Sequence, residues 1–244
     1  MTKNKIILPS GGKIRAVIEN IQPEINGGKY ATKTIQGQKV QISADILIDG
    51  HDYLGQRLWY KHESEKSWTE KPMFAQVNDR FGGEFTAEKI GFYAFKIEAW
   101  VDHFATWQHE VDEKIKAGLK LEVELLVGLD FLNIIAKLAK GQDKEDIKKA
   151  IGIFKNPEKY EEATWICRSE QMHLWIDNYP IKENTCWSEE RLIFADRVKA
   201  EFSAWYSIFP RSATKEVGKH GTFKDVEKLL PRIQELGFDV LYLP

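Results

Sequence analysis

The sequence predicts a multi-domain protein that consists of an all-β, immunoglobulin-like sandwich with a helical insertion, followed by the first βαβ unit of a TIM (β/α)8 barrel. Three observations support this fold class. Residues 1–104 contain short alternating segments separated by turn residues, which is typical of a β-sandwich. After Phe104 the apolar residues recur four apart, which indicates helices. Residues 202–244 read as strand, loop, helix and buried strand, and this order makes one βαβ unit.

The predicted domain organisation has four segments. They are a sandwich at residues 1–104, a helical insertion at 105–188, a strand at 189–200 that returns to the sandwich, and an incomplete barrel at 201–244. A complete (β/α)8 barrel needs about 250 residues. We therefore expect the sequence to hold only the beginning of a barrel, without its other strands.

The predicted strands of the sandwich combine β-branched or aromatic residues with turn residues at their ends. They are Ile14–Glu19, Val40–Ile48, Leu54–His62, Asn78–Phe85 (which begins with a turn), Gly91–Asp102 and, after the helices, Arg191–Asp196. Between the first two, Asn20–Gly28 contains a proline and a pair of glycines, so we expect a turn there.

Helices are expected between these strands because the apolar positions follow a helical period. The first carries Trp107, Val111 and Ile115, and the second spans Leu121–Ala139. Asp143 is a candidate cap for a third helix that stops at Asn156-Pro157. Further helical pieces are expected after Pro157 and at Ser169–Asp177.

The final segment is expected to begin with an aromatic strand that runs from Phe202 and stops at Pro210, because proline cannot donate to a strand ladder. Thr222 is a candidate cap for one amphipathic helix, which Gly237 closes in the left-handed conformation. Phe238–Leu243 is continuously apolar, as parallel strands buried on both faces are.

Composition excludes several classes of protein. Apolar residues make up 43%, charged residues 30%, and the net charge is −2, so nothing favours nucleic acid or an anionic membrane as a partner. No apolar run is long enough to span a membrane, and Met1–Leu8 is too short for an export signal. We expect a cytoplasmic protein in which Cys167 and Cys186 are free thiols, with a disulfide as the alternative.

Particular residues at both ends of the chain resemble one family. In the final segment, Tyr206–Ser212, His220–Phe223 and Leu236–Pro244 resemble the first strand, first helix and second strand of the catalytic barrel of the α-amylase superfamily. More narrowly, Ala204–Ser212 and Val240–Pro244 resemble the maltosyltransferases that extend α-1,4-glucan with maltose 1-phosphate. The N-terminal domain of those enzymes is similar in the same order along the chain. Its matching stretches are Ala44–Asp52, Trp68, Pro72-Met73, Asn78–Phe81, Tyr93–Asp102 and Phe104–Trp107.

The resemblance implies that the chain is the N-terminal part of a glycosyltransferase that transfers maltosyl units to the non-reducing end of α-1,4-glucans with retention, as in glycogen synthesis. It also implies that the two carboxylates of that chemistry lie on later barrel strands. We therefore expect no catalytic residue, no metal site and no cofactor in this sequence, and no activity from it alone. Two alternatives remain: a non-catalytic carbohydrate-binding or dimerisation module, and the N-terminal part of another amylase-type enzyme such as a branching enzyme.

The candidate substrate-binding residues are Tyr206, Phe209 and Arg211, because active sites of such barrels form at the C-terminal ends of the strands. For Tyr206, packing inside the barrel is an equal alternative. The pair His51-Asp52 has the composition of a turn rather than of a catalytic dyad. Trp59, Trp68, Trp100 and Trp107 could stack on sugar rings, but tryptophans in or beside strands are more often core residues.

We also expect a homodimer formed through the helical insertion. Apolar residues of Leu121–Ala139 spread over roughly two-thirds of the helix circumference, whereas a surface helix needs an apolar stripe only about 100° wide or somewhat wider. Charged substitutions of Leu129 and Leu132 are therefore expected to split the dimer. The alternative is that the sandwich, or the segment Pro157–Asp177, covers this second apolar side.

Overall fold

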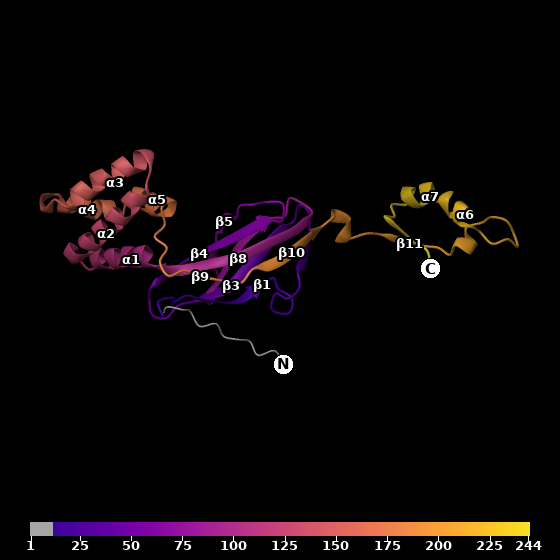
Figure 1. Ribbon diagram of the computed structural model, residues 1–244, viewed down its shortest axis with the longest axis horizontal. Helices are drawn as coiled ribbons and strands as arrows, with labels where there is room; N and C mark the ends of the chain where they lie inside the picture. The colour runs from indigo at the N-terminus through magenta and orange to yellow at the C-terminus, as the bar shows by residue number, and fades with distance from the viewer. Residues whose placement is uncertain (1–11) are drawn as a thin grey trace.

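The computed structural model describes residues 12–244 and is drawn in Figure 1. Three parts follow one another along its length: a block of helices, a β domain, and a small βαβ unit. The expectation about an export signal rests on Met1–Leu8, which lie outside the described residues. Within residues 12–244, no helix is both long and apolar enough to cross a membrane.

The β domain consists of two sheets that share one apolar core. The smaller sheet is antiparallel and has the order β1 (Val17–Gln22), β3 (Lys39–Leu47), β7 (Arg80–Thr86), β6 (Phe74–Ala75). The larger sheet has the order β2 (Thr32–Ile35), β10 (Arg191–Asp196), β8 (Gly91–Asp102), β4 (Tyr53–His62), β5 (Thr69–Pro72), and β9 (Cys186–Trp187) pairs with β8. In this sheet β10 pairs with β2 in parallel and with β8 antiparallel.

Alternation along the strands forms the core between the sheets. In β3, Ile42 and Ile46 are buried, and in β8 Phe95 and Ile97 are buried, because successive side chains of a strand point to opposite faces. Removing each such side chain from water contributes about 1.5–3 kcal/mol. Strand burial therefore explains why these long segments could be recognised from their pattern.

Strands β3, β4, β7, β8 and β10 confirm the predictions to within two residues at each end. The first strand lies three residues later than predicted: β1 is Val17–Gln22 and takes up the first three residues of the expected turn Asn20–Gly28, while residues 26–28 form a turn as predicted. A β-bulge between Glu19 and Gln22 allows this, with Asn20 at a φ of 47°. The pattern did not reveal β2, β5, β6 or β9, which are short and mostly polar or exposed.

The helical block follows β8 without a linker and has a core of its own. Its elements are α1 (His103–Lys116), α2 (Glu122–Leu138), α3 (Gly141–Phe154), the 3-10 turn η1 (Pro157–Lys159), α4 (Tyr160–Cys167) and α5 (Glu170–Asn178). Asp102, the last residue of β8, caps α1 by accepting a hydrogen bond from the Ala105 amide at 2.9 Å. Ser169 caps α5 in the same way, so the helix predicted at Ser169–Asp177 is confirmed.

Two predictions in this block were wrong. Asp143 does not cap α3, because the helix begins earlier, at Gly141, and the Asp143 carboxylate accepts a hydrogen bond from the Tyr179 hydroxyl at 3.0 Å instead. Leu132 does not lie on an uncovered side of α2, because it is 0% exposed within the core of the block. The uncovered side carries other residues, described below.

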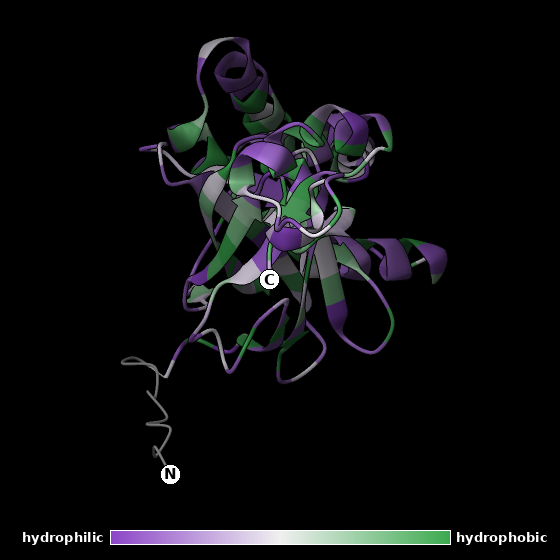
Figure 2. Cartoon of the chain, turned by 90° about the vertical axis from the view of Figure 1, so that its right-hand side faces the viewer, coloured by the Kyte–Doolittle hydropathy of each residue, from purple (hydrophilic) through white to green (hydrophobic). Residues whose placement is uncertain are grey.

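The βαβ unit contains β11 (Trp205–Ser207), the 3-10 turn η3 (Pro210–Ser212), α6 (Phe223–Glu227), α7 (Leu230–Glu235) and β12 (Val240–Tyr242), and a 3-10 turn η2 (Val198–Ala200) precedes it. Its two strands pair in parallel. Thr222 and Asp225 form a capping box at the start of α6, and Gly237 has a φ of 83°, as predicted. In Figure 2 this unit faces the viewer, in front of the β domain.

The elements of this unit are shorter than predicted. The single helix expected after Thr222 is divided into α6 and α7, since Pro231 lies in the first turn of α7 and cannot supply the amide that would continue the hydrogen bonds of α6. Strand β11 has three residues rather than the whole apolar run. Trp205, Phe223 and Leu236 are exposed, so much of the apolar surface of the unit has no covering element among the described residues.

Candidate functional site

The C-terminal end of β11 carries two of the candidate binding residues together. After β11 the chain passes through Phe209 and enters η3, and the Arg211 guanidinium lies 4.9 Å from the centre of the Phe209 ring. A cation held over an aromatic face is stabilised by the ring quadrupole. Both side chains are exposed, so this edge presents one apolar face and one positive charge to a ligand.

Tyr206 is placed differently. Its ring is half-buried and packs edge-on against Phe238, at 5.1 Å between the ring centres. This contact ties β11 to the residues just before β12. The structure therefore brings Phe209 and Arg211 together and packs Tyr206 against Phe238 instead. The role of all three in substrate binding stays a prediction.

The residues considered for catalysis have structural partners. The Asp52 carboxylate accepts a hydrogen bond from Arg15 at 2.6 Å, and Arg15 also bonds Asp49 at 2.7 Å, so Asp52 helps to fasten a turn. The Cys167 thiol is buried, and this burial raises its pKa to about 12, which makes it a poor nucleophile. Within the described residues, no group of three or more His, Cys, Asp or Glu side chains could hold a metal ion.

The tryptophans divide into two groups. Trp100 and Trp107 are both buried. Trp107 belongs to the core of the helical block, where its indole donates a hydrogen bond to the Glu124 carbonyl at 2.9 Å. Trp59 and Trp68 lie half-buried on the outer face of the larger sheet. The ring of Trp68 lies 4.7 Å from the Lys61 ammonium and 4.5 Å from that of Lys96.

A charged cluster on the same face was not recognised from the sequence. Lys182, which follows α5, places its ammonium 2.8 Å from the Glu98 carboxylate and 4.8 Å from the centre of the Trp100 ring. Glu98 also accepts a hydrogen bond from the Trp59 indole at 3.0 Å. The alternation of β8 was the available signal, since it places Glu98 on the outward face opposite Ile97.

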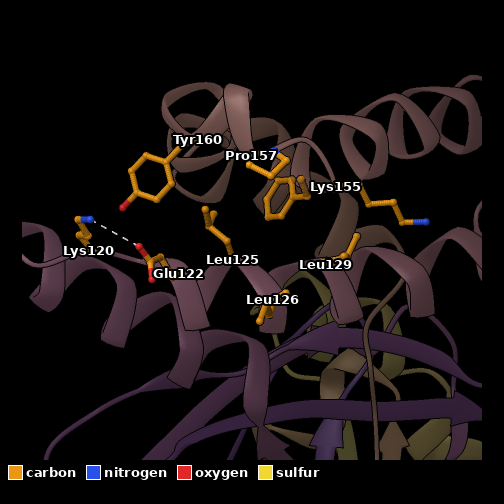
Figure 3. A pocket seen from close by; sticks show the side chains of 9 residues that line it. Lys120, Glu122, Leu125, Leu126, Leu129, Lys155, Pro157 and Tyr160 are labelled. Carbon is orange, nitrogen blue, oxygen red and sulfur yellow. Dashed lines mark ion pairs between the residues drawn. The ribbon is translucent and has the colours of Figure 1, made fainter.

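The helical block has an uncovered apolar side and a groove beside it. Along α2 the side chains of Val123 and Leu126 are each 65% exposed, and that of Leu138 is 51% exposed. The adjoining groove has a volume of about 660 Å³ (Figure 3). It is lined by Lys120, Glu122, Leu125, Leu126, Leu129, Phe154, Lys155, Pro157 and Tyr160.

Figure 3 shows how the groove is built. Side chains of α2, Leu125 and Leu129 among them, form one wall, and Pro157 and Tyr160 form the opposite wall. An ion pair between Lys120 and Glu122, at 3.6 Å, lies at one end. The groove therefore combines an apolar floor with a charged end, which suits a polypeptide surface better than a small polar substrate.

Comparison with known proteins gives consistent results. A family profile described as "Alpha-1,4-glucan:maltose-1-phosphate maltosyltransferase, domain N/S" matches residues 14–197. A protein of that enzyme name from Chlorobaculum tepidum is 36% identical over 237 residues, which cover 97% of this chain and 35% of the relative. The corresponding protein of Methylacidiphilum infernorum is 34% identical over 242 residues, covering 98% of this chain and 36% of the relative.

A protein of the same name from Myxococcus xanthus is 34% identical over 235 residues, which cover 93% of this chain and 35% of the relative. The chain thus spans about a third of the length of the curated relatives it matches. The matched region includes both the β domain with its helical block and, in these relatives, most or all of the βαβ unit.

Proposed function

Because the chain belongs to the alpha-1,4-glucan:maltose-1-phosphate maltosyltransferase family, we propose that it supplies the N-terminal part of an enzyme that transfers maltosyl units from maltose 1-phosphate to α-1,4-glucans. The observation that carries this proposal is the match over 97% of the chain to a protein of that name. Phosphate is the leaving group of the first step, and the non-reducing end of the glucan is the acceptor that attacks in the second step. The names of the relatives do not favour a branching enzyme or a separate binding module.

The chemistry that we propose is retaining transglycosylation. One carboxylate attacks the sugar and a second serves as acid and then base, so that a covalent glycosyl-enzyme forms and is resolved. We assign both carboxylates to later strands of a (β/α)8 barrel whose first strands are β11 and β12. The parallel pairing of these two strands supports this assignment, since a barrel of this type has only parallel strands.

Release of phosphate from maltose 1-phosphate in the presence of glycogen tests the proposal. Protein that joins this chain to a complete barrel should release phosphate and lengthen the glucan, and the 244-residue chain by itself should do neither. Absence of glucan-dependent phosphate release from the protein with a complete barrel would refute the proposed activity. Turnover by the 244-residue chain would refute the assignment of the carboxylates to later strands.

For the domain organisation we propose an immunoglobulin-like β-sandwich at residues 1–104, the helical insertion at 105–188, the return strand at 189–200, and the first barrel elements from 201. Two observations support these boundaries. Strand β10, which follows the insertion in the sequence, pairs with β8 and β2, which precede it. The apolar cores of the β domain and of the helical block contain different residues. We further place the protein in the cytoplasm, where thiols such as those of Cys167 and Cys186 stay reduced.

We also propose that two copies of the protein associate through the helical block. The exposed side of α2 and the groove next to it support a contact of this kind, because contiguous apolar surface on a protein marks an interaction site. Leu126 belongs to both the exposed side and the groove. It is therefore a better residue for testing the contact than Leu132, which holds the block together.

Sedimentation of three versions of the chain tests the dimer. The unmodified chain should sediment as a dimer at micromolar concentration, and Leu126→Asp should sediment as a monomer. Leu174→Asp is the matched control, since Leu174 is an exposed leucine (47%) on α5 and should leave the dimer intact. A monomeric unmodified chain would rule out association through this surface. If both substitutions split the dimer, the contact could not be assigned to α2.

A further inference from the structure

The loop that follows β11 is closed by one glycine. Residues 213–220 leave η3 and return at Gly221, whose amide donates a hydrogen bond to the Arg211 carbonyl at 2.9 Å. A Cβ atom at position 221 would lie 2.4 Å from the Pro210 carbonyl oxygen and 2.8 Å from the Thr214 amide nitrogen. Both neighbours are backbone atoms, which cannot rotate away as a side chain could. Only glycine therefore allows the end of this loop to touch the turn that carries Arg211.

The residues on the other side of Gly221 are fixed as well. The amide of Thr222 donates a hydrogen bond to the Asp225 carboxylate at 2.9 Å, and its hydroxyl donates to the same carboxylate at 2.8 Å. Lys228 pairs with Asp225 at 3.0 Å. Gly221 thus lies between the anchored start of α6 and the turn η3. A side chain introduced at Gly221 would displace η3 and Arg211, because the start of α6 is held in place.

The edge that this contact shapes is positively charged. Arg211 and Lys215 have no carboxylate within 4.0 Å among residues 12–244, while Lys219 pairs with Glu216. Of the two substrates in the proposed function, maltose 1-phosphate carries negative charge and an α-1,4-glucan is neutral. A positive edge at the C-terminal end of a parallel strand is suited to the charged substrate.

We propose that Gly221 is a positioning residue that sets Arg211 for recognition of the anionic sugar-phosphate donor. This inference rests on the proposed function. Displacement of a catalytic group by 1 Å can cost on the order of 100-fold. For a residue at the edge of a site we expect a smaller effect, about a tenfold increase in the KM for maltose 1-phosphate.

The first experiment uses protein in which this chain is joined to a complete barrel. Gly221→Ala should raise the donor KM about tenfold while the KM for glucan and kcat each change less than about twofold. Gly152→Ala is the matched control, because a Cβ there meets nothing within 4 Å, and it should change none of these constants. Equal increases in both KM values, a fall in kcat alone, or no change at all would overturn the proposal.

A second variant and a second readout separate the proposal from the activity on which it rests. Arg211→Gln should raise the donor KM as Gly221→Ala does, and an unchanged donor KM would overturn the role of Arg211.

Hydrogen exchange in the 244-residue chain tests the contact itself. The Gly221 amide should be protected from exchange in the unmodified chain. Gly221→Ala should abolish protection at this position, whereas Arg211→Gln should leave it unchanged. Rapid exchange of the Gly221 amide in the unmodified chain would show that its hydrogen bond to the Arg211 carbonyl is absent, whatever the measured donor KM. Failure of the unmodified enzyme to use maltose 1-phosphate, with protection intact, would refute the proposed function and with it the donor role, but not the contact.

Discussion

At the scale of single residues, Lys182 shows how one charged side chain fastens the end of the helical block to the β domain. Its ammonium lies near the rings of Trp59 and Trp100, at 5.4 and 4.8 Å from their centres. Glu98 is only 4% exposed and neutralises this charge at 2.8 Å. A largely buried charge that loses its partner is costly, because it is left without full compensation by water or by another charge.

Replacing Glu98 by glutamine should therefore lower the free energy of unfolding of the β domain. Breaking a buried pair costs about 3–5 kcal/mol, and we expect about 3 kcal/mol because Glu70 remains 3.6 Å from Lys182. Urea unfolding followed by circular dichroism measures the change. Glu189→Gln is the control, since Glu189 is 82% exposed in its pair with Arg191 and should cost under about 1 kcal/mol. Similar losses in both variants would contradict a special role for the buried pair.

Asp225 makes the start of α6 sensitive to pH. Its bonds to Lys228 and to the Thr222 amide and hydroxyl lower the pKa of the carboxyl to about 2. Because this pKa lies below the value of about 3.9 in an unfolded chain, the bonds stabilise the helix start above about pH 4. The stabilisation is lost as the pH falls through the folded pKa.

We thus expect the Val226 amide, which bonds the Thr222 carbonyl, to lose protection from hydrogen exchange between about pH 4 and pH 2. Asp225→Asn should remove this pH dependence after correction for the intrinsic exchange rate. The effect should be small and weaken with added salt, since the carboxylate is near the surface. If the pH dependence of exchange at the Val226 amide persists in Asp225→Asn, another titrating group must cause it.

At the scale of elements, Gly128 sets how closely three helices pack. A Cβ atom there would lie 2.7 Å from the Trp107 ring of α1 and 2.9 Å from the Phe154 ring of α3. Trp107 is buried and held by its hydrogen bond to Glu124, so it has little freedom to move aside. Helix α2 therefore needs its glycine for packing, although glycine is a poor helix former.

Gly128→Ala should accordingly destabilise the helical block by about 1–3 kcal/mol, which is the usual cost of overpacking a core. Gly152→Ala, in α3, should leave stability unchanged or raise it by up to about 1 kcal/mol, since its Cβ meets no neighbour. Thermal unfolding followed by the helical circular dichroism signal compares the two. A stable Gly128→Ala variant would mean that the three helices pack less tightly than described.

The length of an element decided whether it could be predicted. Strand β8 and helix α2 each carry a long burial pattern of their own, so alternation and helical spacing were enough to place them. Two-residue strands such as β6 and β9 are too short to show alternation, and they exist only because a partner strand supplies their hydrogen bonds. The same limit applies to the candidate site. The predicted strand end identified Phe209 and Arg211 as candidates, but the contact with Gly221 depends on how the intervening loop folds back.

At the scale of the whole molecule, few contacts join the βαβ unit to the β domain. In the connecting segment, Lys199 pairs with Asp239 at 2.5 Å, and Glu201 accepts a hydrogen bond from Gln38 at 3.1 Å. All four side chains are at the surface, where such bonds contribute about 1 kcal/mol or less. The connection is therefore weaker than either part that it joins.

Limited proteolysis of the chain should cut between Arg197 and Phe202 before it cuts inside the β domain, because Phe202 is 81% exposed. Asp239→Asn should speed this cleavage, since it weakens the pair with Lys199. Mass spectrometry of the fragments identifies the site, and Asp225→Asn serves as a control at a carboxylate that does not touch the connection. Uniform protection of residues 197–243 in hydrogen exchange would contradict a weak connection.

The way the helical block leaves and rejoins the larger sheet has a consequence for protein engineering. The chain enters the block from the end of β8 and returns as β9, and these two strands pair directly, with Ala99 opposite Cys186. Cα atoms of directly opposed antiparallel residues are about 4.5–5.5 Å apart. A hairpin turn of two to five residues spans such a gap. The segment between Ala99 and Cys186 can therefore be replaced by a tight turn, or exchanged for another domain with neighbouring termini. The replacement would remove the last three residues of β8 but keep the order of the strands in the sheet.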